Sequence, residues 1–381
     1  MNAGGLHIVV LGLSLSSSWG NGHATTYRSL IRGLRAIGQR VSFLERNTPW
    51  YEAHRDLPAP DFCDLAFYED VEELRSRYGN LIATSDAVIV GSFVPDGVNV
   101  IDLVAQLRPK RFCYYDIDTP VTLARLAGRD AGAEQYVALR QLPLFDICFS
   151  FTGGPTLRHL EELGAARVVE LYCSVDPSRY RNTAEPIQWD LGYLGTYSDD
   201  RQEKLESLLL NVARAMPNRL FVVAGSRYPP GIKWPPNVDR IEHLPPEKHA
   251  SFYSRQRFTL NITRQDMVQA GWSPSVRIFE AAACETPIIS DYWHGLDELL
   301  PIGVAVIVAR STADVVAALD SVSERERASI AAEAGARVMR GHTAERRARQ
   351  LLDDLLSIEP RSAGQVRTGG PNAANPVATA W

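Results

Sequence analysis

The sequence predicts an α/β protein made of two tandem Rossmann-like domains that face each other across a cleft. Short apolar runs alternate with amphipathic helical patterns along most of the 381 residues. Several of these runs are apolar throughout, which is typical of strands buried on both faces of a parallel sheet. The alternation stops over a polar stretch at residues 175–189 and then restarts. This interruption predicts a linker between two domains.

The first half of the chain reads as a parallel sheet covered by helices. Its opening run is strand-like at 7–11, and a helix at 24–38 follows with Leu30, Ile31 and Leu34 on one face. The remaining predicted strands are 41–44, 87–91, 112–115 and 147–151, and the remaining predicted helices are 98–107 and 155–163.

The second half repeats the same alternation and ends on two charged helical patterns. Its predicted strands are 191–194, 220–225, 238–241, 258–262, 287–290 and 304–308, and its predicted helices are 202–216, 247–253, 276–284, 312–319, 325–339 and 344–356. We therefore expect an N-terminal domain at 1–178 and a C-terminal domain at 179–342. A helix at 343–360 is expected to pack back toward the N-terminal domain, and a Gly-, Ala- and Pro-rich tail at 361–381 is expected to be disordered.

Composition and charge narrow the class of protein. Hydrophobic residues make up 45% and charged residues 22%, which is ordinary for a globular protein. The formal net charge is −5 and no basic tract is present, so the sequence does not predict a nucleic-acid-binding protein. Five cysteines without CxxC spacing, no leader-like N-terminus and no apolar span favour a reduced cytoplasmic protein without membrane insertion.

The strongest local signal is the segment SPSVRIFEAAACETPIISD, at residues 273–291. Ser273 and Ser275 precede a short helix that begins at Val276, and the free N–H groups of a helix start suit a diphosphate. Arg277 lies in its first turn, and Glu280 lies one turn inside, where its carboxylate is placed to accept hydrogen bonds from a ribose. The competing interpretation is an ordinary capped helix with a surface salt bridge.

This segment resembles the donor-binding motif of GT-B glycosyltransferases, in particular the CgeB-like group of the glycosyltransferase group-1 type. The phrases LGYLGTYSDDRQEKLESLL, LFVVAGSRYP and GHTAERRARQLLDDL extend the resemblance over the C-terminal half in the same order. It implies two facing Rossmann-like domains and a nucleotide-sugar donor, with a UDP-sugar as the commonest case. It also implies that Glu280 binds the ribose and that the preceding loop holds the pyrophosphate.

Two positions depart from the pattern of that family. Many retaining members carry a second glutamate eight residues before the one that matches Glu280, and this chain has Trp272 there. Glu285 stands where the family usually has glycine. The stereochemical outcome of the family is therefore not carried over to this chain.

Further donor contacts are expected from the loops that follow the strands of the second half. The resemblance implies that the loop with Thr196 and Arg201 supplies basic groups to the diphosphate, and Arg264 is a second candidate just past another strand. Arginine suits this task because its planar guanidinium matches phosphate oxygens. Gly225 lies where the nucleobase rests in related enzymes. Solvated arginines and a plain turn glycine are the alternatives.

The first half offers candidates for the reacting side of the cleft. Gly20 and Gly22 permit close backbone approach just before the first predicted helix, and the resemblance implies that this loop lies near the donor phosphate and the acceptor. His23, at the helix start, is a candidate catalytic contact, with an ordinary surface histidine as the alternative. Asp116 and Asp118 follow a buried strand, at the sheet edge that opens into the cleft. A carboxylate there is placed to deprotonate an acceptor. We predict that Asp118 is the catalytic one, because Thr119 before proline fixes its turn. One aspartate as a turn cap is the alternative.

The expected acceptor pocket and the overall function complete this interpretation. Trp50 and Tyr51 follow the second strand and suit an acceptor pocket, although a plug over the core fits equally. We expect a metal-independent glycosyltransferase that needs no cofactor beyond its nucleotide-sugar co-substrate and acts on a small-molecule or glycan acceptor. A nucleotide-sugar 2-epimerase and a non-catalytic coat or scaffold protein on the same fold are the alternatives.

Overall fold

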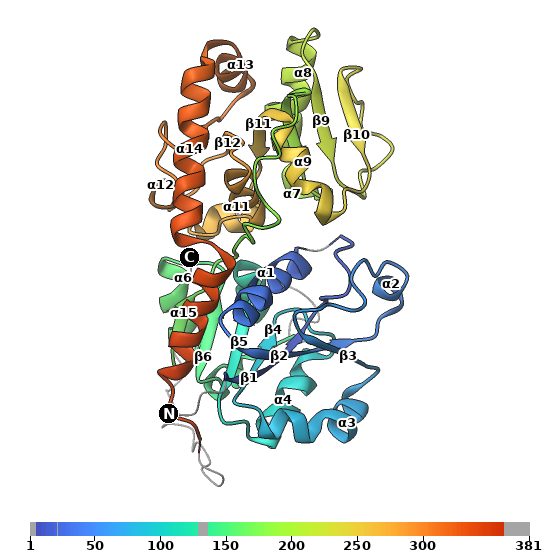
Figure 1. The fold of residues 1–381 in the computed structure, drawn as a ribbon, viewed down its shortest axis with the longest axis vertical. Helices are drawn as coiled ribbons and strands as arrows, with labels where there is room; N and C mark the ends of the chain where they lie inside the picture. Colours follow the sequence, from blue (N-terminus) through green and yellow to red (C-terminus); the bar gives the residue numbers. More distant parts are fainter. Residues whose placement is uncertain (1–4, 21, 129–135, 362–381) are drawn as a thin grey trace.

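The computed structural model describes residues 5–20, 22–128 and 136–361, and it consists of two α/β domains stacked along the long axis (Figure 1). The N-terminal domain contains a seven-stranded sheet in the order β3-β2-β1-β4-β5-β6-β7, and the C-terminal domain a six-stranded sheet in the order β10-β9-β8-β11-β12-β13. Every strand pair is parallel. The predicted fold class is confirmed.

The central strands of the N-terminal domain are buried along nearly their whole length, as their apolar runs predict. The parallel register brings all their carboxyl ends to one edge of the sheet, which faces the other domain. The elements of this domain are β1 (His7–Gly12), α1 (His23–Ala36), β2 (Arg40–Arg46), α2 (Pro49–Glu52), β3 (Asp64–Tyr68), α3 (Val71–Thr84), β4 (Ala87–Gly91), α4 (Gly97–Leu107), β5 (Phe112–Asp116), α5 (Thr119–Leu126), η2 (Leu139–Leu144), β6 (Ile147–Ser150), α6 (Pro155–Glu162) and β7 (Val168–Glu170).

The C-terminal domain repeats this arrangement around β8 and β11. The predicted helix at 202–216 is a succession of α-, π- and α-helical segments, and the predicted strand at 304–308 is only two residues long. Its elements are β8 (Trp189–Leu194), α7 (Asp199–Leu205), η3 (Glu206–Leu210), α8 (Asn211–Ala215), β9 (Phe221–Ala224), β10 (Val238–Ile241), η4 (Pro246–Lys248), α9 (His249–Ser254), β11 (Gln256–Asn261), α10 (Gln265–Ala270), α11 (Val276–Ala283), β12 (Ile288–Ser290), α12 (Leu296–Leu299), β13 (Ile307–Val308), α13 (Thr312–Ser321) and α14 (Glu324–Gly341).

Several elements were not predicted from the sequence, among them β3, α3, α5 and β7. Strand β3 forms the edge of its sheet and only Tyr68 is fully buried in it, so it has no continuous apolar run. The single-turn helix α2 and the six-residue helix α10 are too short to show a helical period in the sequence.

The chain passes between the domains twice, at neighbouring positions. Val175, in the segment after β7, pairs in parallel with Thr343, directly after α14. The Val175 N–H donates to the His342 carbonyl at 3.0 Å, and the Ala344 N–H donates to the Val175 carbonyl at 2.7 Å. Helix α15 (Ala344–Leu356) then packs on α1 of the N-terminal domain, as Figure 1 shows along the edge of the molecule.

The end of the described chain remains on the N-terminal domain. The Arg361 guanidinium forms an ion pair with Asp146 at 2.8 Å, so the ordered part includes the first residue of the predicted tail. Residues 362–381 of that tail lie outside the described residues. Within the described parts of the chain, no helix combines the length and the apolar character needed to cross a membrane.

The contact between α1 and α15 is tight enough to require a glycine. A Cβ atom built on Gly33 would lie 2.1 Å from the Ala344 carbonyl oxygen. By contrast, a Cβ on Gly79, within α3, would lie 3.7 Å from the nearest atom, a methyl of Leu107.

We expect Gly33→Ala to lower the free energy of unfolding by about 1–3 kcal/mol, because the clash with backbone outweighs the gain in helix propensity. Gly79→Ala is the matched control and should be neutral or stabilising by up to ~1 kcal/mol. Urea unfolding of both variants measures the difference. Equal stability of the two variants would contradict the tight α1–α15 contact.

Candidate active site

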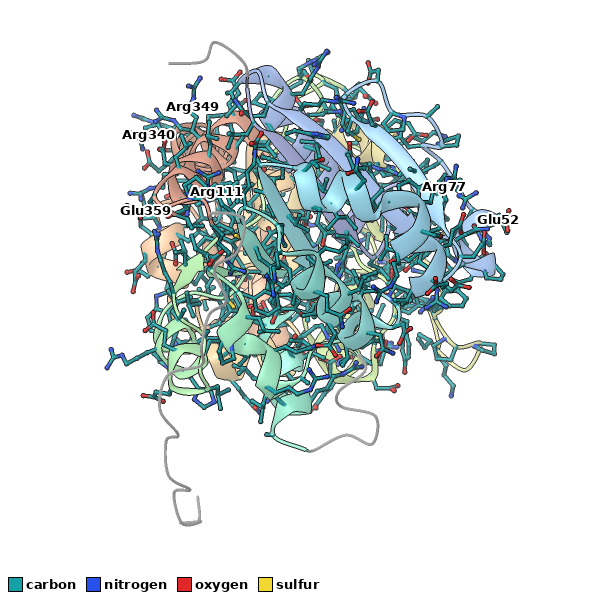
Figure 2. The ribbon with its side chains drawn as sticks, turned by 90° about the horizontal axis from the view of Figure 1, so that it is seen from below. Glu52, Arg77, Arg111, Arg340, Arg349 and Glu359 are labelled. Atoms are coloured by element: carbon teal, nitrogen blue, oxygen red, sulfur yellow. The ribbon has the colours of Figure 1, made fainter. Side chains whose placement is uncertain are left out.

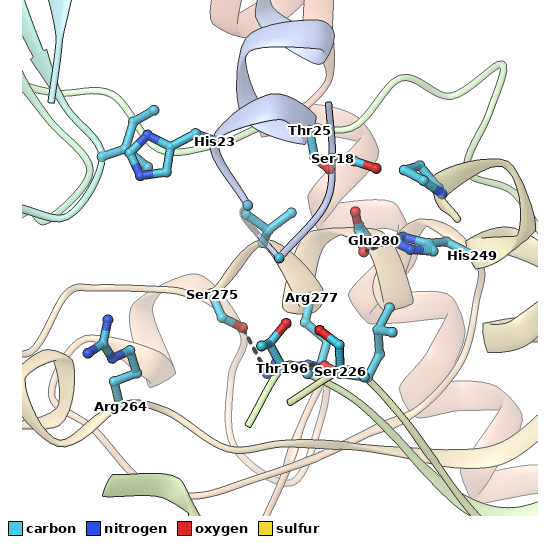
Figure 3. A pocket seen from close by; sticks show the side chains of 18 of the residues that line it. Ser18, His23, Thr25, Thr196, Ser226, His249, Arg264, Ser275, Arg277 and Glu280 are labelled. Atoms are coloured by element: carbon cyan, nitrogen blue, oxygen red, sulfur yellow. Dashed lines mark hydrogen bonds and ion pairs between the residues drawn. The ribbon is translucent and has the colours of Figure 1, made fainter. Parts of the chain in front are cut away.

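A cavity of about 680 Å³ lies between the carboxyl edges of the two sheets. It collects most of the predicted site residues from both domains (Figure 3). The N-terminal domain contributes Gly20, Gly22, His23, Tyr51 and Asp118. The C-terminal domain contributes Thr196, Arg201, Gly225, Arg264, Ser273, Ser275, Val276, Arg277 and Glu280. Of the predicted site residues, Asp116 and Trp50 do not line the cavity.

Glu280 is a buried carboxylate that is held by three side chains. The Tyr180 hydroxyl donates to its Oε1 at 2.8 Å and the Tyr253 hydroxyl to its Oε2 at 3.1 Å, while His249 Nδ1 lies 3.4 Å from Oε2. Burial opposes its charge, but His249 and the two hydroxyls outweigh burial and hold the pKa of Glu280 below its usual value. The carboxylate is therefore ionised, oriented and in contact with the cavity.

The start of α11 is anchored to the ends of two strands. The Ser275 hydroxyl and the Arg277 guanidinium both donate to Asn261 Oδ1, at 2.7 and 2.8 Å, and Arg277 also donates to the Leu194 carbonyl. The guanidinium lies over the Tyr193 ring at 4.8 Å. Arg277 thus forms part of the rigid wall of the cavity and fixes the helix start from which the first N–H groups point.

The loop after β8 brings a second arginine to the same wall. Arg201, in the first turn of α7, donates to the Thr196 carbonyl at 2.6 Å. Gly225 has φ +149°, and a Cβ there would lie 2.0 Å from the Gly195 carbonyl oxygen, so the loops after β8 and β9 meet only because this residue is glycine. Arg264 caps α10, and its Nε lies 3.6 Å from Asp200.

His23 and Asp118 face each other across the N-terminal side of the cavity. His23 Nε2 lies 2.9 Å from Asp118 Oδ2, and the Asp118 side chain is the more exposed of the two, at 24% against 7%. Burial opposes the charge of Asp118, but His23, Arg264 and Arg125 together hold its pKa below the usual value. An ionised carboxylate backed by an imidazole therefore faces the cavity.

Asp116 lies beneath this pair and is closed off from the cavity. It is 2% exposed, and its Oδ1 accepts from the Thr122 hydroxyl at 3.0 Å and from the Asp118 N–H at 3.3 Å. Burial and the nearby Asp118 charge raise its pKa to about 7. Asp116 supports the turn that presents Asp118 and does not reach a ligand in the cavity.

Only one of the two predicted acceptor aromatics lines the cavity. Tyr51 does so and is 8% exposed, whereas Trp50 is 59% exposed and does not. Both belong to the single turn α2, in which successive side chains point about 100° apart. The expectation for Trp50 is corrected on this ground.

Trp272 fills the position at which the family carries its second glutamate. Its ring lies against Gly154 of the N-terminal domain and Gly295 of the C-terminal domain, and its Nε1 donates to Glu298 at 3.0 Å. The Trp272 side chain therefore packs the two domains against each other. Among the described residues that line the cavity, the carboxylates are Asp118, Glu242 and Glu280.

Sequence reasoning missed several residues of the site. Tyr180 lies in the polar linker, outside any motif. His249 and Tyr253 lie on α9, within the segment NVDRIEHLPPEKHASFYSRQRFTLNITR that shares the family resemblance, but nothing in that segment singles them out as contacts of Glu280. Trp19 stacks on His54 at 4.4 Å and lies 4.9 Å from His243 of the opposite domain. An aromatic contact between distant loops leaves no signal in one sequence.

Two facing Rossmann-like domains with a ligand-sized cavity between them and a C-terminal helix that returns to the first domain are the features of the GT-B fold. Residues 201–353 match the family model described as "Glycosyl transferase-like". The predicted resemblance to GT-B glycosyltransferases is confirmed by this match and by the fold. No curated protein sequence matches the chain significantly.

Solved structures with the same fold cover almost the whole chain. Sucrose-phosphate synthase from Thermosynechococcus elongatus superimposes with a TM-score of 0.65 at 14% identity, covering 92% of this chain and 99% of that one. HepE from Anabaena, solved with UDP and glucose, superimposes with a TM-score of 0.67 at 13% identity, covering 93% of this chain and 100% of that one. An alpha-glucosyltransferase solved with UDP-glucose and DNA superimposes with a TM-score of 0.67 at 13% identity, covering 93% of this chain and 100% of that one.

We expect Glu280→Gln to weaken UDP binding about 10- to 100-fold, because a charged hydrogen bond is worth roughly 1.5–3 kcal/mol. Calorimetry with UDP and with 2′,3′-dideoxy-UDP tests the ribose assignment. The wild type should bind the dideoxy compound more weakly than UDP, and the variant should bind both alike.

Glu285→Gln is the control, because this exposed glutamate follows the same helix and does not line the cavity. Unchanged UDP affinity in a folded Glu280→Gln protein would exclude the role of Glu280 at the ribose.

Proposed function

We propose that this glycosyltransferase moves a sugar from a UDP-sugar to a small-molecule or glycan acceptor. The observation that carries the proposal is the pairing, in one cavity, of the anchored Glu280 carboxylate on one domain with the His23–Asp118 pair on the other. HepE and the alpha-glucosyltransferase, which share the fold, were solved with UDP-glucose. Their ligands support a UDP-sugar as the donor.

The wall between these two groups suits the diphosphate. In Figure 3, Glu280 and His249 lie on one side of the cavity and Arg264 lies on the other, with Thr196, Ser275 and Arg277 between them. The nucleotide would thus run from a ribose at Glu280 to a diphosphate at the start of α11 and at Arg201 and Arg264. Helix N–H groups and guanidinium groups stabilise the negative charge of the departing diphosphate.

Asp118 then faces the anomeric carbon and the acceptor hydroxyl. Its ionised carboxylate accepts a hydrogen bond from that hydroxyl and stabilises positive charge that develops on the sugar ring. The new bond forms between the acceptor oxygen and the anomeric carbon as the bond to the diphosphate breaks. The hydroxyl proton passes to the Asp118–His23 pair.

We further propose that the protein acts in a reducing compartment such as the cytoplasm. All five cysteines are free, and four of them are buried. A net charge of −5 favours a small or glycan acceptor over nucleic acid.

Turnover is proposed to be independent of metal, because arginines and helix N–H groups supply the positive charge around the donor. Among the described residues, no group of three or more His, Cys, Asp and Glu side chains is arranged to hold a metal ion.

A thermal-shift comparison of UDP-, dTDP- and GDP-sugars in EDTA tests the donor and the metal independence together. We expect UDP-sugars to raise the melting temperature most, because a ligand that binds only the native state stabilises it. Turnover with the preferred donor should be equal with and without EDTA. A larger shift with another nucleotide, or rescue by magnesium or manganese, would contradict the respective part of the proposal.

We expect Asp118→Asn to lower UDP release from a UDP-sugar by about 10²- to 10⁴-fold, because asparagine keeps the turn but cannot take a proton. UDP affinity and melting temperature should hold. Asp116→Asn is the matched comparison, since this carboxylate does not reach the cavity. Retained turnover in Asp118→Asn together with loss in Asp116→Asn would show that Asp116 is the reacting carboxylate.

A further inference from the structure

Beside the cavity, the N-terminal domain holds an arginine, Arg125, that packs against aromatic rings. Arg125, in the last turn of α5, has its guanidinium 4.6 Å from the centre of the Tyr136 ring and 5.2 Å from that of Phe93. Its Nε is buried without a hydrogen-bond partner. Within the described residues, no Asp or Glu lies within ion-pair distance of it.

This cation belongs to the same corner of the molecule as Asp118. Asp118 directly precedes the first residue of α5, and Arg125 lies seven residues later, close to two full turns, on the same face of the helix. Helical side chains lean toward the N-terminus, which carries the guanidinium toward Asp118. Its charge contributes to the lowered pKa of Asp118.

Phe93 connects the arginine to the cavity. Its ring lines the cavity, and its centroid lies 5.6 Å from that of the His23 ring and 5.2 Å from the Arg125 guanidinium. Phe93 has φ +62°, a left-handed conformation that is costly for a bulky side chain. The loop after β4 therefore holds an aromatic ring in contact with both His23 and Arg125 at a conformational cost.

The donor does not need this charge. The arginines that line the C-terminal side, Arg201, Arg264 and Arg277, come from the loops and helix that would hold the diphosphate. Arg125 lies on the opposite domain, next to the group that faces the acceptor. The guanidinium packs against two rings that also contact each other, with centroids 4.6 Å apart, and this packing restricts its orientation and shields it partly from water, which strengthens its attraction for an anion.

We propose that Arg125 forms an anion subsite for the acceptor, so that the acceptor is a small molecule carrying a phosphate or a carboxylate in addition to the hydroxyl that receives the sugar. This inference rests on the proposed glycosyltransferase function. Arg125 binds the anionic group while Asp118 contacts the hydroxyl, and the distance between the two side chains selects acceptors by size.

The test uses the full chain saturated with UDP, titrated with glucose, glucose 6-phosphate and glucuronate in a calorimeter. We expect at least one anionic probe to bind tenfold or more tightly than glucose. Preference for the phosphate or for the uronate tells which anion the subsite takes. If neither anionic probe binds more tightly than glucose, the anion subsite is wrong.

Variants separate a ligand contact from a packing role. Arg125→Gln should remove the preference for the anionic probe, and Arg125→Lys should keep part of it, while UDP affinity stays unchanged. Arg77→Gln is the matched control: Arg77 also lies over a ring, that of Tyr78 at 5.2 Å, and is exposed on α3 (Figure 2). It should leave the preference unchanged.

The outcomes distinguish this inference from the proposed function. If folded Arg125→Gln keeps the preference for the anionic probe, the subsite is wrong and the donor site is unaffected. If Arg125→Gln does not fold, an equal preference in Arg125→Lys and the wild type leads to the same conclusion. Failure of the wild type to bind UDP overturns the proposed function instead.

Discussion

The site depends on one short contact, the parallel bridge between Val175 and Thr343, where the chain crosses between the domains in both directions. Two backbone hydrogen bonds and the close packing of α15 on Gly33 fix the C-terminal domain relative to the N-terminal one. The bridge also fixes the start of the linker. Tyr180, five residues beyond Val175, reaches the Glu280 carboxylate from the linker at 2.8 Å. The segment that joins the domains therefore orients the carboxylate assigned to the ribose.

Other contacts hold the two sides of the cleft together. The Thr152 and Ser273 hydroxyls lie 2.9 Å apart, and the Gly153 N–H donates to the Trp272 carbonyl at 2.8 Å. Trp272 replaces a family carboxylate with a large ring that packs between glycines of both domains. The Trp19 ring of the N-terminal domain lies 4.9 Å from the His243 ring of the C-terminal domain, in a tilted arrangement. A cavity bounded in this way keeps the donor wall and the reacting pair at a fixed separation, which is what transfer between two bound substrates requires.

The local sequence pattern was sufficient to predict a residue's position where that position depends only on the residue's own helix or strand. Continuous apolar runs predict the buried strands, and a strand end predicts that Asp118 opens toward the other domain. Position relative to a second element was not predictable. The choice between Trp50 and Tyr51 depends on the rotation of a single turn, and Tyr180 depends on the path of a polar linker. Arg125 lies in α5, a helix that the sequence pattern did not predict, and the rings that it packs against come from other segments.

The two aspartates after β5 show how burial divides similar residues between structure and chemistry. Asp116 is enclosed at the end of the sheet, and the loss of water together with the charge of Asp118 raises its pKa to about 7. Asp118, two residues on, keeps its charge because His23, Arg264 and Arg125 face it. Near neutral pH a proton on Asp116 relieves the repulsion between the carboxylates, so the negative charge concentrates on the one that reaches the cavity. The arginines near Asp118 thus have two roles: they stabilise the charge of Asp118, and they attract the anionic groups of the substrates.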